Sequence, residues 1–300
     1  MSLRLAAMNA ALRAVAKPAL ARTGTPERAR RDFERIAPLL RGPAHLREIR
    51  RPGPPPLGWL SAGPVPAGRA ILWFHGGAYV AGSLRTHRGM LGRLSRLART
   101  EVCAPEYRLA PEAPFPAAFE DACAAWGLLR AQGLAPGDIV LGGDSAGGGL
   151  ALALLSRLLE EGERPRAAVL FSPWVDLTLS GASLRENARA DPLLPVERIE
   201  ELVDIVAPEA DRRDPRLSPL FAPFRAPPPV LIQASRTEIL RDDARRMATR
   251  LRAADGRVHL DLWPDTPHVW QILDGWLPEA RAALARAGDF VQTAFAETMR

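Results

Sequence analysis

The sequence predicts an α/β fold in which a mostly parallel central sheet is covered by helices on both faces. The main observation is an alternation of short apolar runs with stretches of helical periodicity through the middle of the chain. Near-continuous apolar strands separated by helices are typical of parallel sheets, whose strands are buried on both faces. With 300 residues, of which 47% are apolar, the chain can bury a substantial core.

The expected strands and helices alternate from residue 70 onward. We expect strands at 70–76, 101–107, 138–144, 167–173, 229–235 and 258–264. We expect helices at 86–99, 118–133, 146–162, 242–256 and 277–299.

Two stretches fall outside this alternation, and they define the expected domain organisation. They are the first 45 residues and a proline-bracketed helical insert at 189–213. We expect residues 46–188 and 214–300 to form the core. The segments 1–45 and 189–213 are then expected to form a small helical cap over the carboxyl edge of the sheet, where open α/β sheets place their ligands.

The charge balance raises the question of a nucleic-acid partner, because the sequence pI is about 10.4. Of the 40 basic residues only Lys17 is a lysine, and the arginines are scattered among 34 acidic residues. A bias of the whole coding sequence explains this pattern better than a basic binding surface does. We therefore expect no nucleic-acid partner.

The cysteines and the amino terminus bear on location. Cys103 and Cys123 are too few for a disulfide framework and lack metal-ligand spacing, so we expect a cytoplasmic protein. The first 21 residues are interrupted by Arg4, Arg13 and Lys17, which favours an amphipathic helix over a signal peptide. No segment approaches the roughly 20 apolar residues of a membrane span, so no stable membrane anchor is expected.

A candidate nucleophile lies between an expected strand and an expected helix. Residues 143–147 read Gly-Asp-Ser-Ala-Gly, a G-x-S-x-G pattern centred on Ser145. Such a turn holds the serine in a strained conformation and places its hydroxyl at a helix N-terminus, whose dipole favours negative charge. The alternative is a phosphate-binding loop, but the Lys-Ser/Thr ending that such a loop requires is missing.

A candidate anion site follows the first expected strand. His75-Gly76-Gly77-Ala78 opens a loop in which backbone N–H groups without secondary-structure partners could point at an oxyanion. Ala146 N–H, directly after the serine, would supply another donor. An ordinary glycine turn is the alternative, and the nearby serine motif argues against it.

Several motifs occur together and in a recognisable order. The chain resembles the hormone-sensitive-lipase-like branch of the α/β-hydrolases, a group of bacterial carboxylesterases, and the resemblance extends from about residue 70 to the end. The motifs that carry it are "HGGAYVAGS" (75–83), "EYRLAPEAPFPAAFEDA" (106–122), "GDSAGG" (143–148), "DPRLSPLF" (214–221) and "WPDTPHVWQ" (263–271). The resemblance implies an α/β-hydrolase fold and hydrolysis of short-to-medium acyl esters.

The resemblance also implies an oxyanion hole. Gly77, Ala78 and Ala146 would supply its N–H groups, and Gly76 would shape the loop. The family usually has a third glycine where this chain has Ala78. A methyl group leaves the backbone donor in place, so the hole should survive with a changed acyl pocket.

Five histidines compete for the role of general base. His268 follows the last expected strand in a loop, as the chain order serine, acid, histidine requires. His75 belongs to the oxyanion loop, His45 precedes the first core strand and His259 lies inside a strand. His87 begins a helix near the site, where it is either structural or a substrate contact. We expect His268 to be the base.

The acid that orients the base is sought in "SRTEILRDD" (235–243), just past an expected strand. Glu238 lies before the helical pattern starts, and the family usually has Asp there, although some members carry Glu. Asp242 and Asp243 come about a turn later, where acids commonly cap a helix. Asp265 is suited to shaping a turn. We expect Glu238 to be the acid, with Asp176 and Asp242 as alternatives.

These residues predict a serine carboxylesterase that uses a Ser145-His268-Glu238 triad, a covalent acyl-enzyme and a small-molecule ester, without metal or organic cofactor. The main alternative is an amidase or deacetylase, since the same catalytic groups can cleave ester bonds and amide bonds. A non-catalytic ligand-binding protein on this fold, as in plant hormone receptors, is disfavoured because His268 is retained. The last expected strand forms an edge of the sheet, where a second copy of the chain could pair, so a homodimer is an open alternative.

Overall fold

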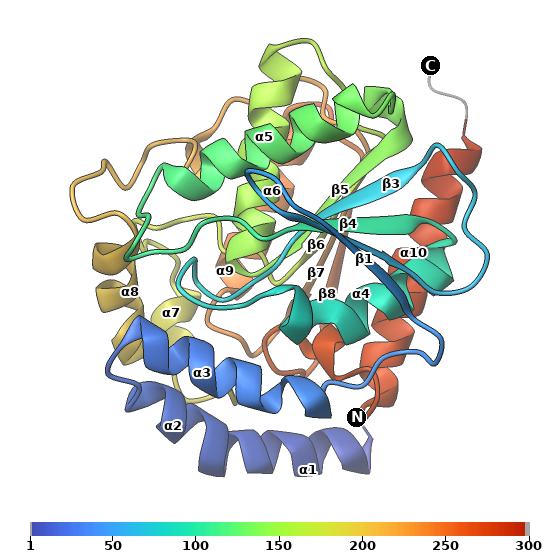
Figure 1. Ribbon diagram of the computed structural model, residues 1–300. Coiled ribbons are helices and arrows are strands. Elements are labelled where there is room, and N and C mark those ends of the chain that lie inside the picture. Colours follow the sequence, from blue (N-terminus) through green and yellow to red (C-terminus); the bar gives the residue numbers. More distant parts are fainter. Residues whose placement is uncertain (1, 298–300) are drawn as a thin grey trace.

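An eight-stranded sheet forms the centre of the protein, as seen in a computed structural model that describes residues 2–297 (Figure 1). Its strands lie in the order β1-β2-β4-β3-β5-β6-β7-β8, and all pairings from β4 to β8 are parallel. The predicted α/β class and all six predicted strands are therefore confirmed. The strands are β1 (Arg47–Arg51), β2 (Leu57–Ser61), β3 (Ala70–Phe74), β4 (Glu101–Pro105), β5 (Ile139–Asp144), β6 (Ala167–Phe171), β7 (Val230–Ser235) and β8 (Val258–Trp263).

The antiparallel strands β1 and β2 were not predicted. β1 reads Arg-Glu-Ile-Arg-Arg and forms a sheet edge, where charged side chains protect the unpaired backbone. Its single apolar residue, Ile49, pairs with Trp59 of β2. A strand with so little apolar character shows no alternation that a sequence pattern could reveal.

The main helices cover both faces of the sheet, as predicted. α4 and α10 pack on one face around Trp73 and Phe171, and α5, α6 and α9 cover the other. The last two residues of the helix expected at 277–299 lie outside the described residues. The bounds are α4 (Leu84–Ala98), α5 (Ala117–Ala131), α6 (Ala146–Glu160), α9 (Arg241–Ala253) and α10 (Pro278–Ala296).

The amino-terminal segment and the insert lie against each other (Figure 1). α1 (Leu3–Ala11), the π-helical η1 (Leu12–Ala16) and α2 (Lys17–Ala21) form one continuous helix, and α3 (Pro26–Ile36) follows. Arg198 at the end of η4 donates to Thr23 O at 2.7 Å. α7 (Ser183–Glu186) precedes the insert, and the insert contains η4 (Val196–Arg198) and α8 (Ile199–Val206). The remaining short 3₁₀ helices are η2 (Ala37–Leu39), η3 (Pro136–Asp138), η5 (Pro219–Phe221) and η6 (Trp270–Leu273).

Within the described residues, no helix combines the length and the apolar character that a membrane crossing requires.

Glycines at the β5–α6 junction allow strands and helix to approach closely. A Cβ atom added to Gly147 would lie 2.1 Å from Phe74 O, the last carbonyl of β3. A Cβ atom on Gly143 would lie 2.2 Å from Gly147 O. Both contacts are to backbone atoms, so a side chain at either position would push α6 away from the sheet.

We predict that Gly147→Ala lowers the free energy of unfolding by about 1–3 kcal/mol, because the methyl group has no space against Phe74 O. Gly127→Ala is the matched control in α5, since its added Cβ would meet nothing within 4 Å. That change should stabilise the protein by about 0.5–1 kcal/mol through helix propensity. Urea unfolding would measure both, and equal effects of the two changes would contradict the close approach.

Candidate active site

Ser145 occupies a strained turn between β5 and α6. Its backbone has φ 52° and ψ −124°, a region that residues with a Cβ rarely adopt. Four backbone bonds hold it there. Ser145 N donates to Phe171 O at 2.9 Å, and Ser145 O accepts from Trp174 N at 2.9 Å, Gly148 N at 3.0 Å and Gly149 N at 3.2 Å. The turn is therefore fixed by β6 and the loop after it, as well as by its own helix.

The loop after β3 lies beside this turn. Gly76 N donates to Asp144 Oδ2 at 3.0 Å, so that N–H group is occupied. The next residues adopt positive φ, 125° at Gly77 and 53° at Ala78. Among the hydrogen bonds of residues 2–297, the N–H groups of Gly77, Ala78 and Ala146 have no acceptor. These three groups are thus available to an incoming anion.

Asp144 connects the serine turn to this loop, a role that the sequence analysis missed. Its buried carboxylate accepts from Trp73 Nε1 at 2.9 Å and from Gly76 N, and it lies 3.1 Å from His87 Nε2. Burial alone would raise the pKa of Asp144, but His87 and the Trp73 hydrogen bond outweigh burial and lower it. His87 is only 1% exposed, so it has the structural role considered for it and is not placed to meet a substrate.

His75 is buried beneath the same loop. Its ring stacks on Tyr107 at 4.4 Å, and Nδ1 lies 2.9 Å from Gly76 O. Burial, followed by the neighbouring His87, lowers the pKa of His75 to about 4. The ring is therefore neutral near pH 7 and packs against the loop.

Glu238 and His268 form a buried pair at the carboxyl end of the sheet. Glu238 Oε2 lies 2.6 Å from His268 Nδ1. The other carboxylate oxygen, Oε1, accepts from Ser235 N at 2.6 Å and Ser172 Oγ at 3.0 Å. Burial alone would lower the pKa of His268, but the hydrogen bond and the charge of Glu238 raise it.

The other candidate carboxylates have different partners. Asp176 accepts from Arg246 Nη1 at 2.8 Å and from the hydroxyl of Ser180. Asp242 accepts from Ser183 N at 2.9 Å. In the part of the chain that the structure describes, Glu238 is the carboxylate that bonds to His268.

Asp243 and Asp265 are the remaining acids considered near the site, and Asp243 is engaged with the backbone. Asp243 accepts from Val175 N at 2.9 Å and Asp176 N at 3.1 Å, and burial raises the pKa of Asp243 to about 7. Asp265 has φ 54° and lies at the turn after β8, the kind of position expected for it.

Ser145 and His268 are not joined by a hydrogen bond among the described residues, although both lie at the carboxyl end of the sheet. Ser145 follows β5 directly, and the His268 loop follows β8. Ser172, after β6, connects the two regions: its Oγ accepts from Val269 N at 3.3 Å, and Trp174, two residues later, bonds to Ser145 O. In substrate-free enzymes the serine–histidine bond is often long and tightens in the complex.

The sequence analysis also missed three residues around Glu238. Ser172 donates to its carboxylate, Asn187 Nδ2 donates to Glu238 O at 2.8 Å, and Asp191 Oδ2 accepts from Ile239 N at 2.9 Å. Ser172 lies inside the strand predicted at 167–173, whereas the observed strand β6 ends at Phe171, so no sequence signal pointed to a contact with Glu238. Asn187 and Asp191 act through backbone groups of a distant loop, and no local pattern marks such contacts.

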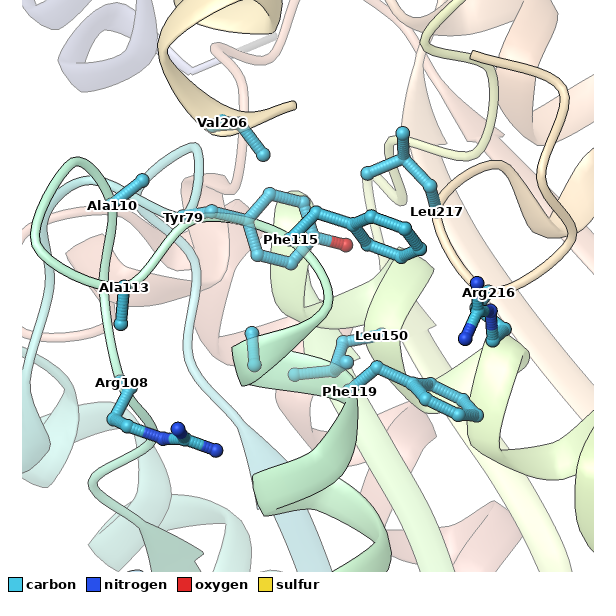
Figure 2. Close-up of a pocket in the computed structure, with 11 residues that line it drawn as sticks. Tyr79, Arg108, Ala110, Ala113, Phe115, Phe119, Leu150, Val206, Arg216 and Leu217 are labelled. Atoms are coloured by element: carbon cyan, nitrogen blue, oxygen red, sulfur yellow. The ribbon is translucent and has the colours of Figure 1, made fainter. Parts of the chain in front are cut away.

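A small pocket adjoins the oxyanion loop (Figure 2). Its lining includes Tyr79 directly after Ala78, Leu150 of α6 and Val206 at the end of α8. The cavity volume is only about 20 Å³, close to the space that one water molecule needs. Within residues 2–297, no cluster of three or more His, Cys, Asp or Glu side chains could hold a metal ion.

Comparison with known proteins identifies the family of the chain. Residues 71–272 match the family model of the α/β hydrolase fold. An acetyl-hydrolase of Streptomyces hygroscopicus is 41% identical over 234 residues, 78% of each chain. An esterase of Acinetobacter venetianus is 39% identical over 230 residues, 75% of each chain.

Solved structures extend the likeness to nearly the whole chain. The crystal structure of an esterase from the bacterial hormone-sensitive lipase family superposes with a TM-score of 0.92 at 38% identity, covering 98% of this chain and 99% of that one. The structure of EstE5 soaked with ethyl alcohol gives a TM-score of 0.94 at 35% identity, covering 99% and 100%. The chain therefore belongs to the α/β-hydrolase family, among the bacterial esterases that resemble hormone-sensitive lipase, and it is a carboxylic ester hydrolase.

Proposed function

We propose that the protein is a serine carboxylesterase that works through Ser145, His268 and Glu238. The observation that carries the proposal is the buried bond of 2.6 Å between Glu238 Oε2 and His268 Nδ1, at the edge of the sheet where Ser145 is held in a strained turn. A carboxylate at Nδ1 leaves Nε2 free to take a proton from a hydroxyl group. Ester hydrolysis by a nucleophilic serine needs this tautomer.

The reaction would proceed in two halves. His268 Nε2 takes the proton of Ser145 as Oγ attacks the ester carbonyl, and Glu238 stabilises the imidazolium that forms. The tetrahedral intermediate collapses when His268 returns that proton to the leaving alcohol, which leaves an acyl-enzyme. A water molecule, activated by His268, then attacks the acyl-enzyme and releases the acid.

The oxyanion of the tetrahedral intermediate would accept hydrogen bonds from Gly77, Ala78 and Ala146. The absence of other acceptors for these N–H groups among the described residues supports this role. The bond of Gly76 N to Asp144 keeps the loop in place. Donors fixed before the reaction need no reorganisation when charge develops, and the loss of one typically costs about 3–4 kcal/mol.

We further propose that residues 1–45 and 189–213 act as a cap and that the site prefers short-to-medium acyl groups. Val206 of the insert lines a small pocket together with Tyr79, the residue after Ala78, which supports the role of the insert as part of a cap. Two relatives are named for acetyl esters, the acetyl-hydrolase at 41% identity and an ethyl acetate hydrolase of Pseudomonas putida at 31%.

Ser145→Ala should abolish hydrolysis of p-nitrophenyl acetate, with kcat falling by about 10⁴-fold or more, because no other group can form the acyl-enzyme. Thermal unfolding is expected to remain cooperative, since alanine fits the same turn. A fluorophosphonate probe should label the wild type and not the variant. Retention of the wild-type rate would rule out Ser145 as the nucleophile.

Glu238→Gln should lower the pKa of His268, because the carboxylate is what offsets the effect of burial on the ring. The base must be neutral to accept a proton, so the acid limb of the kcat/KM profile should move to lower pH while the maximum rate falls. NMR titration of the histidine ring protons would measure the pKa of His268 directly. An unchanged His268 titration would contradict the pairing.

Esters of short acyl chains should be hydrolysed faster than long-chain esters, as the names of the acetyl-hydrolase and the ethyl acetate hydrolase among the relatives suggest. A panel of p-nitrophenyl esters from acetate to palmitate would measure this preference. Matched anilides in the same panel test the amidase alternative. Faster turnover of palmitate, or anilide rates equal to ester rates, would contradict the proposed substrate class.

A further inference from the structure

The continuous helix of residues 3–21, here called the N-terminal helix, contacts the loop that carries His268 and the segment at 187–191, which in turn contacts the loop that carries Glu238. Asn9 Nδ2 donates to Asp265 O at 2.6 Å, three residues before His268. Two turns further along, Lys17 Nζ donates to Asp191 O at 2.8 Å and to Ala188 O at 2.7 Å. One rigid element therefore connects the loop of the base to the segment at 187–191.

The segment at 187–191 holds the backbone on both sides of the Glu238 side chain. Asn187 Nδ2 donates to Glu238 O at 2.8 Å and to Arg236 O at 3.0 Å. Asp191 Oδ2 accepts from Ile239 N at 2.9 Å, and Asp191 is fully buried. A shift of this segment would therefore shift the main chain from which the Glu238 carboxylate extends.

Lys17 is chemically distinct within the chain. It is the only lysine among 40 basic residues, and it is half-buried with its ammonium group shared between two carbonyl oxygens. Charge-assisted hydrogen bonds are roughly twice as strong as neutral ones. Arg13 adds a bond from Nη2 to Ala190 O at 3.0 Å. The N-terminal helix thus donates to three carbonyls in four consecutive residues.

Asn9 is the matching contact at the other end. Its side chain is 3% exposed, and its Oδ1 atom has no hydrogen-bond partner in the described part of the chain. A buried amide with an unsatisfied oxygen costs stability, and an apolar residue of similar size would avoid that cost. The bond to Asp265 O is the contact that an apolar residue could not provide.

We propose that Lys17 and Asn9 are positioning residues, through which the N-terminal helix holds the Glu238 and His268 loops at the separation that catalysis needs. The inference rests on the proposed roles of Glu238 and His268, and it assigns the helix a part in the chemistry beyond covering the site. Lys17 acts on Glu238 through residues 187–191, and Asn9 acts on His268 through the turn at Asp265.

A looser Glu238–His268 pair has a defined consequence for pH dependence. Three acids raise the pKa of His268 against the effect of burial: Glu238, which is hydrogen-bonded to the ring, and the more distant Asp191 and Asp144. If the Glu238 loop shifts, its contribution weakens with distance. The acid limb of the rate profile then moves to lower pH, while substrate binding is little affected.

The test compares Lys17→Met with Arg4→Met, which removes an exposed positive charge from the same helix. Rates are expressed per active site titrated with a fluorophosphonate, so that unfolded protein does not count. For Lys17→Met we expect kcat to fall about 3- to 10-fold, a KM within about twofold of the wild type, and an acid limb at lower pH. Arg4→Met should match the wild type. Equal kcat values and pH profiles for the two variants would overturn the proposal.

Two further variants exclude a merely structural role. Lys17→Arg retains charged donors for Ala188 O and Asp191 O, so it should restore most of kcat and the pH profile. Asn9→Leu removes the bond to Asp265 O with a side chain of similar shape. It should also lower kcat and move the acid limb of the rate profile to lower pH. If Lys17→Met does not fold, Asn9→Leu alone decides: a wild-type pH profile there would overturn the proposal.

The Glu238→Gln background separates this inference from the proposed function. If Lys17 acts through Glu238, adding Lys17→Met to Glu238→Gln should lower kcat by less than about twofold. A full additional loss would overturn the positioning role and leave the triad intact. Wild-type activity of Glu238→Gln itself would instead refute the triad.

Discussion

The structure at the carboxyl edge of the sheet depends on the Glu238 carboxylate, which is fully buried. An isolated buried charge is costly, so Glu238 is compatible with folding only because hydrogen bonds and a partner surround it. Ser235 N, Ser172 Oγ and His268 Nδ1 supply these bonds from three different parts of the chain. The requirement to satisfy one charge therefore brings the ends of β6, β7 and β8 together.

The parallel sheet makes this convergence possible. Carboxyl ends of parallel strands lie along one edge, so the segments that follow β3, β5, β6, β7 and β8 become neighbours although they are distant in sequence. Ser145 extends β5 and the loop from His75 extends β3, its direct partner in the sheet. Asp144 then ties the two segments through Gly76 N, so the strained serine turn and the loop after β3 form one unit.

Elements outside the sheet complete the support of this edge. Asn187 and Asp191 bond to the backbone of Glu238 and Ile239, and the N-terminal helix contacts Asp191 through Lys17. α3 reaches the oxyanion loop, since Arg30 Nε donates to Val80 O at 2.7 Å. Backbone carbonyls accept most of these bonds, so the supporting side chains act on loop positions and not on the reacting atoms.

Strong local signals in the sequence determined much of the fold and several candidate residues. Apolar strands, helical periodicity and the G-x-S-x-G turn depend on near neighbours, which is why β3 to β8, the main helices and Ser145 could be predicted from the sequence. The position of Glu238 past β7 and of His268 past β8 followed from the same order. The charged edge strand β1 carried no such signal and was missed.

Only the tertiary structure decided which groups meet. Glu238, and not Asp176 or Asp242, lies beside His268, while Arg246 and Ser183 bond to the other two carboxylates. His87 could have faced a substrate, but its burial against Asp144 gives it a structural role. The links from Lys17 and Asn9 to distant carbonyls had no sequence pattern at all. A hydrogen bond to a backbone group does not depend on the identity of the accepting residue, so its partner becomes known only when the chain is folded.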